Sequence, residues 1–235
     1  DLPMPLAGCE RIASLDVLRG FALLGILIMN MQSFAMPDAA YFNPTAWGDL
    51  TGLNLVAWAA AHIMADQKFM ALFSLLFGAG VVLFSERIEA RGQRPARLHY
   101  RRTFLLFVIG MAHAYLLWSG DILVTYALCS TVVFLVRGWR PRTLLVVGIA
   151  VLAVGSLLSL MSGLSLPWWP AEDIAAMREQ WNPSAAALSA DLNAYRGGWV
   201  EQMASRAASA YDLQTTAFIF VLGWRAAGLM LIGMA

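Results

Sequence analysis

The amino-acid sequence predicts an all-α fold, a polytopic transmembrane helix bundle. Six apolar runs lie along the 235 residues, each close to or above the length that spans a bilayer. The arginines between them fall almost entirely in alternate connections. Hydrophobic residues make up 60% of the chain and the mean hydropathy is +0.64, more apolar surface than a soluble globule of this size hides.

The six runs give the expected membrane spans in order. They are predicted at 17–36, 69–84, 103–118, 122–136, 143–161 and 213–235. A helix needs about 20 residues to cross the hydrocarbon core, and roughly 17 is the lower limit. The shorter runs therefore need polar flanks that continue the helix or reach the interface.

The charges between the runs predict the topology. The second and third runs are separated by arginines at 87, 91, 94, 97, 101 and 102, and the fourth and fifth by arginines at 137, 140 and 142. The other connections are mainly acidic. Short Arg-rich loops stay in the cytoplasm, so the N-terminus is expected there and the acidic loops outside. A net charge of +1 gives no indication of a nucleic-acid partner.

Two connections have helical character of their own. Residues 54–65 are too short to span and are expected to form an interfacial helix on the outer surface. Residues 163–212 predict an extracytoplasmic cap of one or two short amphipathic helices. Everything else belongs to a single transmembrane domain covering 1–235. Because the chain lacks an initiator methionine and stops within an apolar run, we expect it to be part of a longer protein.

Small residues predict two close helix contacts. Ser74 and Gly78 are four apart on the second span, and Gly110 and Ala114 are four apart on the third. This spacing lets helix backbones approach each other in a membrane.

Polar residues inside spans are costly and are the default functional candidates. On the first span, Asp16, Arg19 and Asn30 share one face, with Asn30 about 16 Å above Arg19. On the third span, Arg102 and His113 are also eleven residues apart and share a face. Two such stripes facing one interior would line a path with a cationic inner mouth.

Each of these residues also has a purely structural interpretation. Asp16 and Arg19 are spaced as an ion pair, and Asn30 is equally suited to an interhelical hydrogen bond. Lys68 is placed to reach the outer surface. The two remaining histidines, His62 and His99, are expected to be solvated and without a role.

His113 is the strongest candidate for chemistry. It lies within a span, and Asp121 follows in the short turn after it. A carboxylate there would orient the imidazole ring and raise its basicity. No group of residues has metal-ligand spacing, and the two cysteines, Cys9 and Cys129, give no disulfide framework. No metal site is therefore predicted.

Three segments carry a family resemblance. They are RIASLDVLRGFALLGILIMN at 11–30, KFMALFSLLFGAG at 68–80 and HAYLLWSGDILVTYAL at 113–128. Together they resemble the YeiB family of bacterial inner-membrane proteins, also described as DUF418 proteins. The resemblance implies a multi-pass protein of the bacterial inner (cytoplasmic) membrane, with further helices after this chain.

The first segment is also similar to the opening helix of the wider transmembrane acyltransferase superfamily, which includes the acyltransferase-3 enzymes and heparan glucosaminide acetyltransferase. That resemblance implies transfer of an acyl group from a cytoplasmic acyl-CoA to an acceptor on the far side. In acyltransferase-3 proteins a catalytic histidine follows ten residues after the motif glycine. Here that position is Asn30, an amide that cannot act as a base.

The leading hypothesis is therefore an acyltransferase-like protein in the lipid bilayer, with acyl-CoA as donor substrate and no bound cofactor. Its acceptor would be a small molecule or an envelope glycan. The expected substrate-binding residues are Asp16, Arg19, Asn30, Lys68, Arg101 and Arg102, and the expected catalytic residues are His113 and Asp121. The same stripes also fit a transporter or channel component, and a structural or regulatory protein without turnover remains a third reading.

Overall fold

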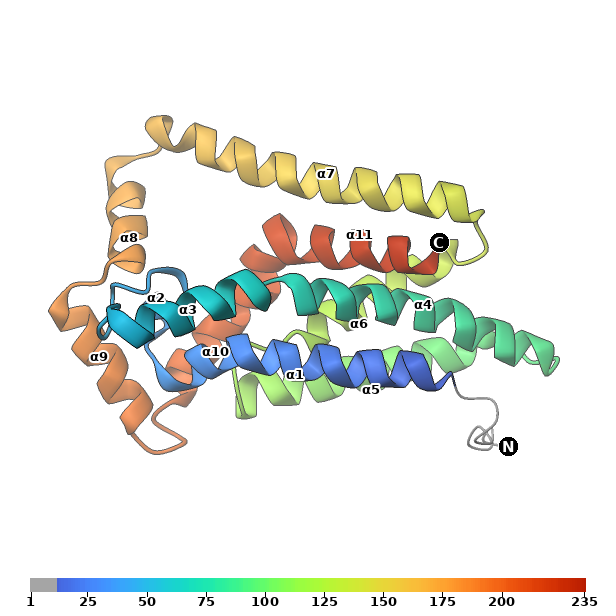
Figure 1. Ribbon diagram of the computed structural model, residues 1–235, viewed down its shortest axis with the longest axis horizontal. Helices are drawn as coiled ribbons and strands as arrows, with labels where there is room; N and C mark the ends of the chain where they lie inside the picture. Colours follow the sequence, from blue (N-terminus) through green and yellow to red (C-terminus); the bar gives the residue numbers. More distant parts are fainter. Residues whose placement is uncertain (1–11) are drawn as a thin grey trace.

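A computed structural model describes residues 12–235, and every regular element among them is a helix (Figure 1). The first half contains α1 (Ala13–Ala35), α2 (Asp38–Phe42), α3 (Gly52–Met64), α4 (Lys68–Ala90), α5 (Pro95–Leu116), α6 (Leu123–Val133) and η2 (Phe134–Val136). The second half contains α7 (Pro141–Ser165), η3 (Leu166–Trp168), α8 (Ala171–Trp181), α9 (Ala185–Arg196), α10 (Met203–Asp212), η4 (Leu213–Leu222) and α11 (Gly223–Met234). The helical fold class is confirmed; Cys9 lies outside the described residues.

Within residues 12–235, four stretches are long and apolar enough to cross a membrane. They are Ala13–Ala35, Gly52–Ala90, Pro141–Trp168 and Met203–Met234. The other two expected spans coincide with helices as well. The run at 103–118 lies in α5, whose first turns are basic, and the run at 122–136 forms the shorter apolar helix Leu123–Val136.

α11 lies at the centre of the bundle. It packs against α7, α4 and α6, and its Ala226, Met230, Leu231 and Met234 form one side of the buried core. The other side is formed by residues of α6 and α7: Tyr126, Cys129, Val133 and Leu144.

The crossing of α4 and α11 depends on two glycines. A Cβ atom added to Gly78 would lie 2.0 Å from the carbonyl oxygen of Met230, and one added to Gly233 would lie 2.0 Å from that of Leu75. The predicted close contact is thus confirmed at Gly78, with α11 as its partner, whereas the buried Ser74 shares a hydrogen bond with Tyr126 of α6. Gly110 has the same role towards Val124, the second residue of α6.

α3 and α4 follow one another along nearly the same line, separated by a short break (Figure 1). At the break, Gln67 has a φ of 61°, the left-handed conformation that a residue with a side chain adopts at a cost. The helix expected at 54–65 is therefore present as α3, and it leads into α4 without a sharp turn. Its position at the membrane surface stays a prediction.

The segment at 163–212 folds into three short helices, α8, α9 and α10, which gather with α2 at one end of the bundle (Figure 1). This is one helix more than the composition predicted. Side chains of the segment hold it to the bundle: Trp199 Nε1 and Arg206 Nη1 both donate to the carbonyl oxygen of Leu116, at 2.7 and 3.3 Å. These contacts fix α10 at the end of α5.

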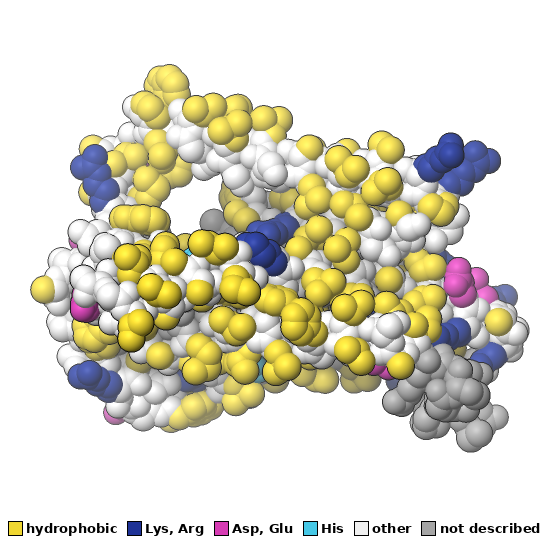
Figure 2. Space-filling view, viewed as in Figure 1, with side chains coloured by type: hydrophobic (Ala, Val, Ile, Leu, Met, Phe, Trp, Pro, Cys, Tyr) yellow, Lys and Arg dark blue, Asp and Glu magenta, His cyan; other side chains and the backbone are white. Residues whose placement is uncertain are grey.

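The surface of the bundle is largely apolar. Figure 2 shows hydrophobic side chains covering most of the middle of one face. Many large apolar residues of α1, α5 and α7 are exposed, such as Val17, Phe104 and Val146 at 64–70%. A helix that is apolar towards the outside as well as the inside is typical of a membrane bundle. The fold therefore supports a helical membrane protein.

Candidate functional site

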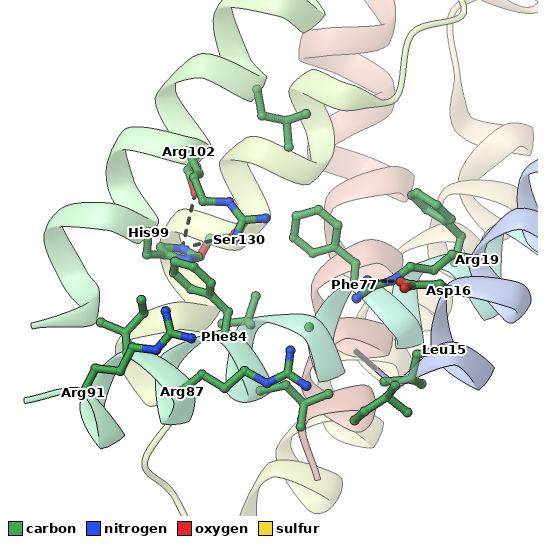
Figure 3. Close-up of a pocket in the computed structure, with 18 residues that line it drawn as sticks. Leu15, Asp16, Arg19, Phe77, Phe84, Arg87, Arg91, His99, Arg102 and Ser130 are labelled. Carbon is green, nitrogen blue, oxygen red and sulfur yellow. Dashed lines mark hydrogen bonds and ion pairs between the residues drawn. The ribbon is translucent and has the colours of Figure 1, made fainter. Parts of the chain in front are cut away.

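A cavity of about 920 Å³ lies between α1, α4, α5 and α6. Four arginines line it, from three of these helices: Arg19, Arg87, Arg91 and Arg102 (Figure 3). Among the described residues that line it, Asp16 is the single carboxylate. The excess of positive charge gives this cavity a positive electrostatic potential, which attracts anions.

The first helix places Arg19 in the cavity wall through two contacts. Its Nη1 lies 3.7 Å from Asp16 Oδ1, and its Nη2 donates to the carbonyl oxygen of Leu76 at 3.2 Å. The guanidinium group fits against α4 because Gly80 has no side chain; a Cβ there would lie 2.5 Å from Nη2. Asp16 thus forms the ion pair that its spacing allowed, at the rim of the cavity.

Aromatic rings form part of the same walls. The guanidinium carbon of Arg102 lies 4.4 Å from the ring centroid of Phe84, a cation–π contact, and Phe73 and Phe77 continue along α4. Such a contact holds the charged group in a fixed orientation. The cavity is therefore cationic at one end and apolar along its α4 wall.

His99 is buried in this wall, so the expectation that it is solvated is wrong. It is only 5% exposed, and its ring stacks on Phe134 at 4.0 Å between centroids. Nε2 lies 3.2 Å from the carbonyl oxygen of Ser130 and 3.3 Å from each of the hydroxyl oxygens of Ser130 and Thr103. Ser130 belongs to α6 and Phe134 to η2, the neighbouring elements of the helical hairpin that the short turn at Ser119 and Gly120 predicts.

Protonation of His99 is expected to destabilise the fold. His99 precedes the apolar run that begins at Thr103. Burial lowers the pKa of its imidazole, and the positive charges of Arg102 and Arg137 lower it further. The hydrogen bond to Ser130 raises the pKa but does not outweigh them. As pH falls below the ordinary value of about 6.5, the unfolded chain takes up the proton first. Stability contributed by neutral His99 is thus complete above that pH and is lost as pH falls towards the lowered pKa.

This prediction is tested by thermal unfolding of the wild type and His99→Gln between pH 7.5 and 5. Gln keeps a donor for the Ser130 carbonyl group but does not titrate in this range. The wild type should lose melting temperature relative to the variant as the pH falls. A constant difference between the two proteins across this range would contradict the prediction.

At the other end of α5, His113 and Asp121 are in contact, as their spacing predicted. His113 Nδ1 lies 2.9 Å from Asp121 Oδ1. Asp121 Oδ2 accepts the backbone N–H of Val124 at 3.0 Å and so caps α6. The Asp121 side chain is 1% exposed and that of His113 is 34% exposed. The carboxylate is therefore fixed, while the imidazole ring remains accessible.

The surroundings of Asp121 set its charge state. Burial raises the pKa of this carboxyl group, which lies in the turn between α5 and α6. The backbone N–H of Val124 and the imidazole of His113 oppose that rise. Burial therefore favours the neutral acid, and the hydrogen bonds from Val124 and His113 favour the ionised carboxylate.

Ring contacts bring the two polar stripes together at this end. Phe34 of α1 contacts Trp118 at 4.8 Å between centroids, and Trp118 contacts His113 at 6.2 Å. Asn30 is half-buried one turn before Phe34 on α1. At the opposite end, Arg19 and Arg102 line one cavity. Arg19 and Arg102 therefore share a cavity, and Phe34 and His113 share Trp118 as a neighbour.

Two expected site residues lie elsewhere. Lys68 is exposed, and its Nζ donates to the carbonyl oxygens of His62 and Asp66, both at 3.4 Å, so it closes the end of α3. Arg101 is exposed and does not line the cavity. No cluster of three potential metal ligands occurs among residues 12–235.

Four basic or polar positions were missed. Arg87 and Arg91 were assigned to a loop, because the second span was expected to end at residue 84, whereas α4 continues to Ala90 and carries Arg87 into the cavity wall. Ser130 gave no signal of its own. Arg225 was overlooked, although an arginine within an apolar run is itself a signal.

Comparison with known proteins identifies relatives. The chain is 34% identical to the uncharacterized protein YeiB of Escherichia coli K12 over 228 residues, covering 96% of the chain and 55% of YeiB. It is 41% identical over 147 residues to the uncharacterized protein YxaH of Bacillus subtilis 168, covering 58% of the chain and 35% of YxaH. An uncharacterized 39.9 kDa protein from Bacillus acidopullulyticus is 36% identical over 126 residues, 54% of the chain and 34% of that protein.

No family model and no solved structure matches the chain. The chain spans about half the length of YeiB and about a third of the other two relatives. The match to YeiB includes nearly every residue described above, so the resemblance predicted from the three segments is confirmed. This chain belongs to the YeiB family.

Proposed function

We propose that this protein is a membrane acyltransferase that binds an acyl-CoA in the arginine-lined cavity and delivers the acyl group to an acceptor near His113. The observation that carries the proposal is the pair of sites at the two ends of α5. An arginine-lined cavity lies at its first turns, and a histidine–carboxylate pair lies at its last turn.

The proposal includes a membrane orientation. All six apolar runs would cross the bilayer, with α5 and α6 as a hairpin, and the Arg-rich connections would lie in the cytoplasm. The cavity would then open to the compartment that contains acyl-CoA, and His113 would lie near the outer surface. His113 is seven residues beyond Leu106 of the cavity lining, or about 10 Å along α5, a gap that an extended pantetheine arm bridges.

His113 would act as the general base. If its Nδ1–H donates to Asp121, Nε2 is free to accept a proton from the acceptor hydroxyl or amine. The acceptor atom then attacks the thioester carbonyl carbon, the carbon–sulfur bond breaks, and the CoA sulfur takes the proton back from Nε2. Asn30 would donate a hydrogen bond to the carbonyl oxygen as negative charge develops.

The test uses the full-length protein in liposomes loaded with acyl-CoA that is radiolabelled in the acyl group, with envelope extract outside. The expected result is label covalently attached to an outer acceptor only when active protein is present. Label that stays on CoA while a solute crosses the membrane would refute the acyltransferase and support transport.

A transporter is the second candidate because two helices are interrupted. The chain unwinds between α3 and α4, where Asp66 Oδ1 is buried without a hydrogen-bond partner. Residues 213–222 form a π-helix directly before Arg225. Interrupted helices and intramembrane charges are typical of solute paths through transporters.

A further inference from the structure

We infer that the ligand of the cavity is a phosphorylated amphiphile, with its phosphates among the arginines and a long hydrocarbon chain leaving sideways between α1 and α5. The inference rests on the proposed function for the identity of the site, and it adds the chemical class of the ligand. A short acyl group on a soluble carrier would contact the arginines of the cavity and leave its apolar lining uncovered.

The charged half suits a phosphate group. Arg19, Arg87 and Arg102 come from three different helices and enclose the same space (Figure 3). Planar guanidinium groups bind phosphate oxygens in pairs, and His99 lies in the same wall. One carboxylate, Asp16, leaves the arginines of this wall in excess within the described part of the chain.

An apolar part of the lining lies on the membrane-centre side of Arg87 and Arg102, level with Arg19. Phe77 is ten residues from Arg87 on α4, about 15 Å along the helix, and Phe73 lies one turn further. Leu106 lies one turn beyond Arg102 on α5. This apolar surface adds no binding free energy for a soluble anion. A hydrocarbon chain that packs against it is removed from water, which favours binding.

α1 and α5 border the cavity on opposite sides and hardly pack against each other, which leaves a gap that would face the bilayer. Asp16 and Arg19 of α1 lie on one side of it and His99 and Arg102 of α5 on the other (Figure 3). The main packing partner of α1 is α4, and that of α5 is α6. The two helices are joined at the outer end through Phe34 and Trp118.

The flanks of this opening are apolar. On α1, Leu18 is 41% exposed, and on α5, Phe104 is 64% exposed. In a membrane these side chains contact lipid tails, so an alkyl chain can pass between the helices without meeting water. The opening thus suits an amphiphile whose tail remains in the bilayer.

Two sources supply this chemistry, a long-chain acyl-CoA and a membrane lipid with a phosphate head. The experiment separates them by measuring binding to the full-length protein in phosphatidylcholine nanodiscs. The probes are acetyl-CoA, palmitoyl-CoA and dioleoyl phosphatidate. We expect palmitoyl-CoA to bind at least tenfold more tightly than acetyl-CoA.

Three variants identify the site. Arg102→Gln should lower the affinity for every probe at least fivefold, because all of the probes carry phosphate. Leu106→Asn should weaken palmitoyl-CoA and leave acetyl-CoA unchanged. Arg101→Gln, an exposed arginine outside the cavity, is the matched control and should bind like the wild type. Size-exclusion profiles establish that each variant folds.

The outcomes separate this inference from the proposed function. Equal affinities for acetyl-CoA and palmitoyl-CoA would refute the inference that the ligand is an amphiphile, and the acyltransferase proposal would stand. Binding of phosphatidate alone would uphold the amphiphile and refute acyl-CoA as donor. If Arg102→Gln leaves the affinity for the probes unchanged, the probes are partitioning into the lipid and not binding in the cavity. That result would refute the inference.

Discussion

Replacement of Gly78 by leucine is expected to destroy the packing of α4 on α11. The backbone carbonyl group of Met230 occupies the space that the new side chain needs, and a Cβ alone would lie 2.0 Å from its oxygen. Backbone cannot move aside as a flexible side chain does, so the two helices must separate. Overpacking typically costs about 1–3 kcal/mol, and more where backbone blocks the new side chain. Against a total stability of roughly 5–15 kcal/mol, this is a large loss.

The measurement is thermal unfolding in detergent, with the monodisperse fraction on size exclusion as a second readout. Gly233→Leu should lower the melting temperature in the same way, because the new Cβ would meet the carbonyl oxygen of Leu75. Gly163→Ala is the control: a Cβ there meets nothing within 4 Å, and alanine favours the helix by about 1 kcal/mol. A Gly78→Leu protein as stable as this control would show that α4 and α11 do not cross here.

The helical bundle and its two polar stripes could be predicted because both depend on periodicity within one helix. Arg19 and Asn30 on α1, and Arg102 and His113 on α5, are each eleven residues apart, a separation that returns to the same helix face. The contact of His113 with Asp121 also follows from local spacing, since the turn between α5 and α6 is short.

The residues that meet between packed helices could not be predicted in the same way. His99 is buried because α6 and η2 bring Ser130 and Phe134 against it, 31 and 35 residues later in the chain. Charge alone indicated a solvated loop. Arg87 was misplaced for a related reason: hydropathy marks where a helix meets polar solvent, and α4 continues beyond that point.

The number of spans shows the limit of composition. The first turns of α5 carry Arg97, Arg101 and Arg102. The helix is 22 residues long, but these charges make it too polar to be recognised as a span by length and apolarity. α6 with η2 is short. The six-span topology therefore rests on the charge pattern, and four spans follow from helix length and apolarity.

Replacement of His113 by alanine is expected to lower the rate of acyl transfer by about 10²–10⁴-fold, the usual contribution of a general base. Binding of acyl-CoA should be unchanged, because the cavity lies at the other end of α5. Asp121→Asn should lower the rate less, since it removes the charge that orients the ring and supports its protonation. Asparagine is also a good helix cap and can still accept the N–H of Val124, so α6 should remain folded.

The double variant tests whether the two residues act as a unit. If Asp121 works through His113, then adding Asp121→Asn to His113→Ala should cost little further rate, and the two single effects should not add. His62→Ala is the matched control, a histidine of α3 whose ring lies 4.3 Å from that of Trp58 between centroids. Additive losses in the double variant would mean that Asp121 acts through α6 instead, and an active His113→Ala protein would remove the base from the mechanism altogether.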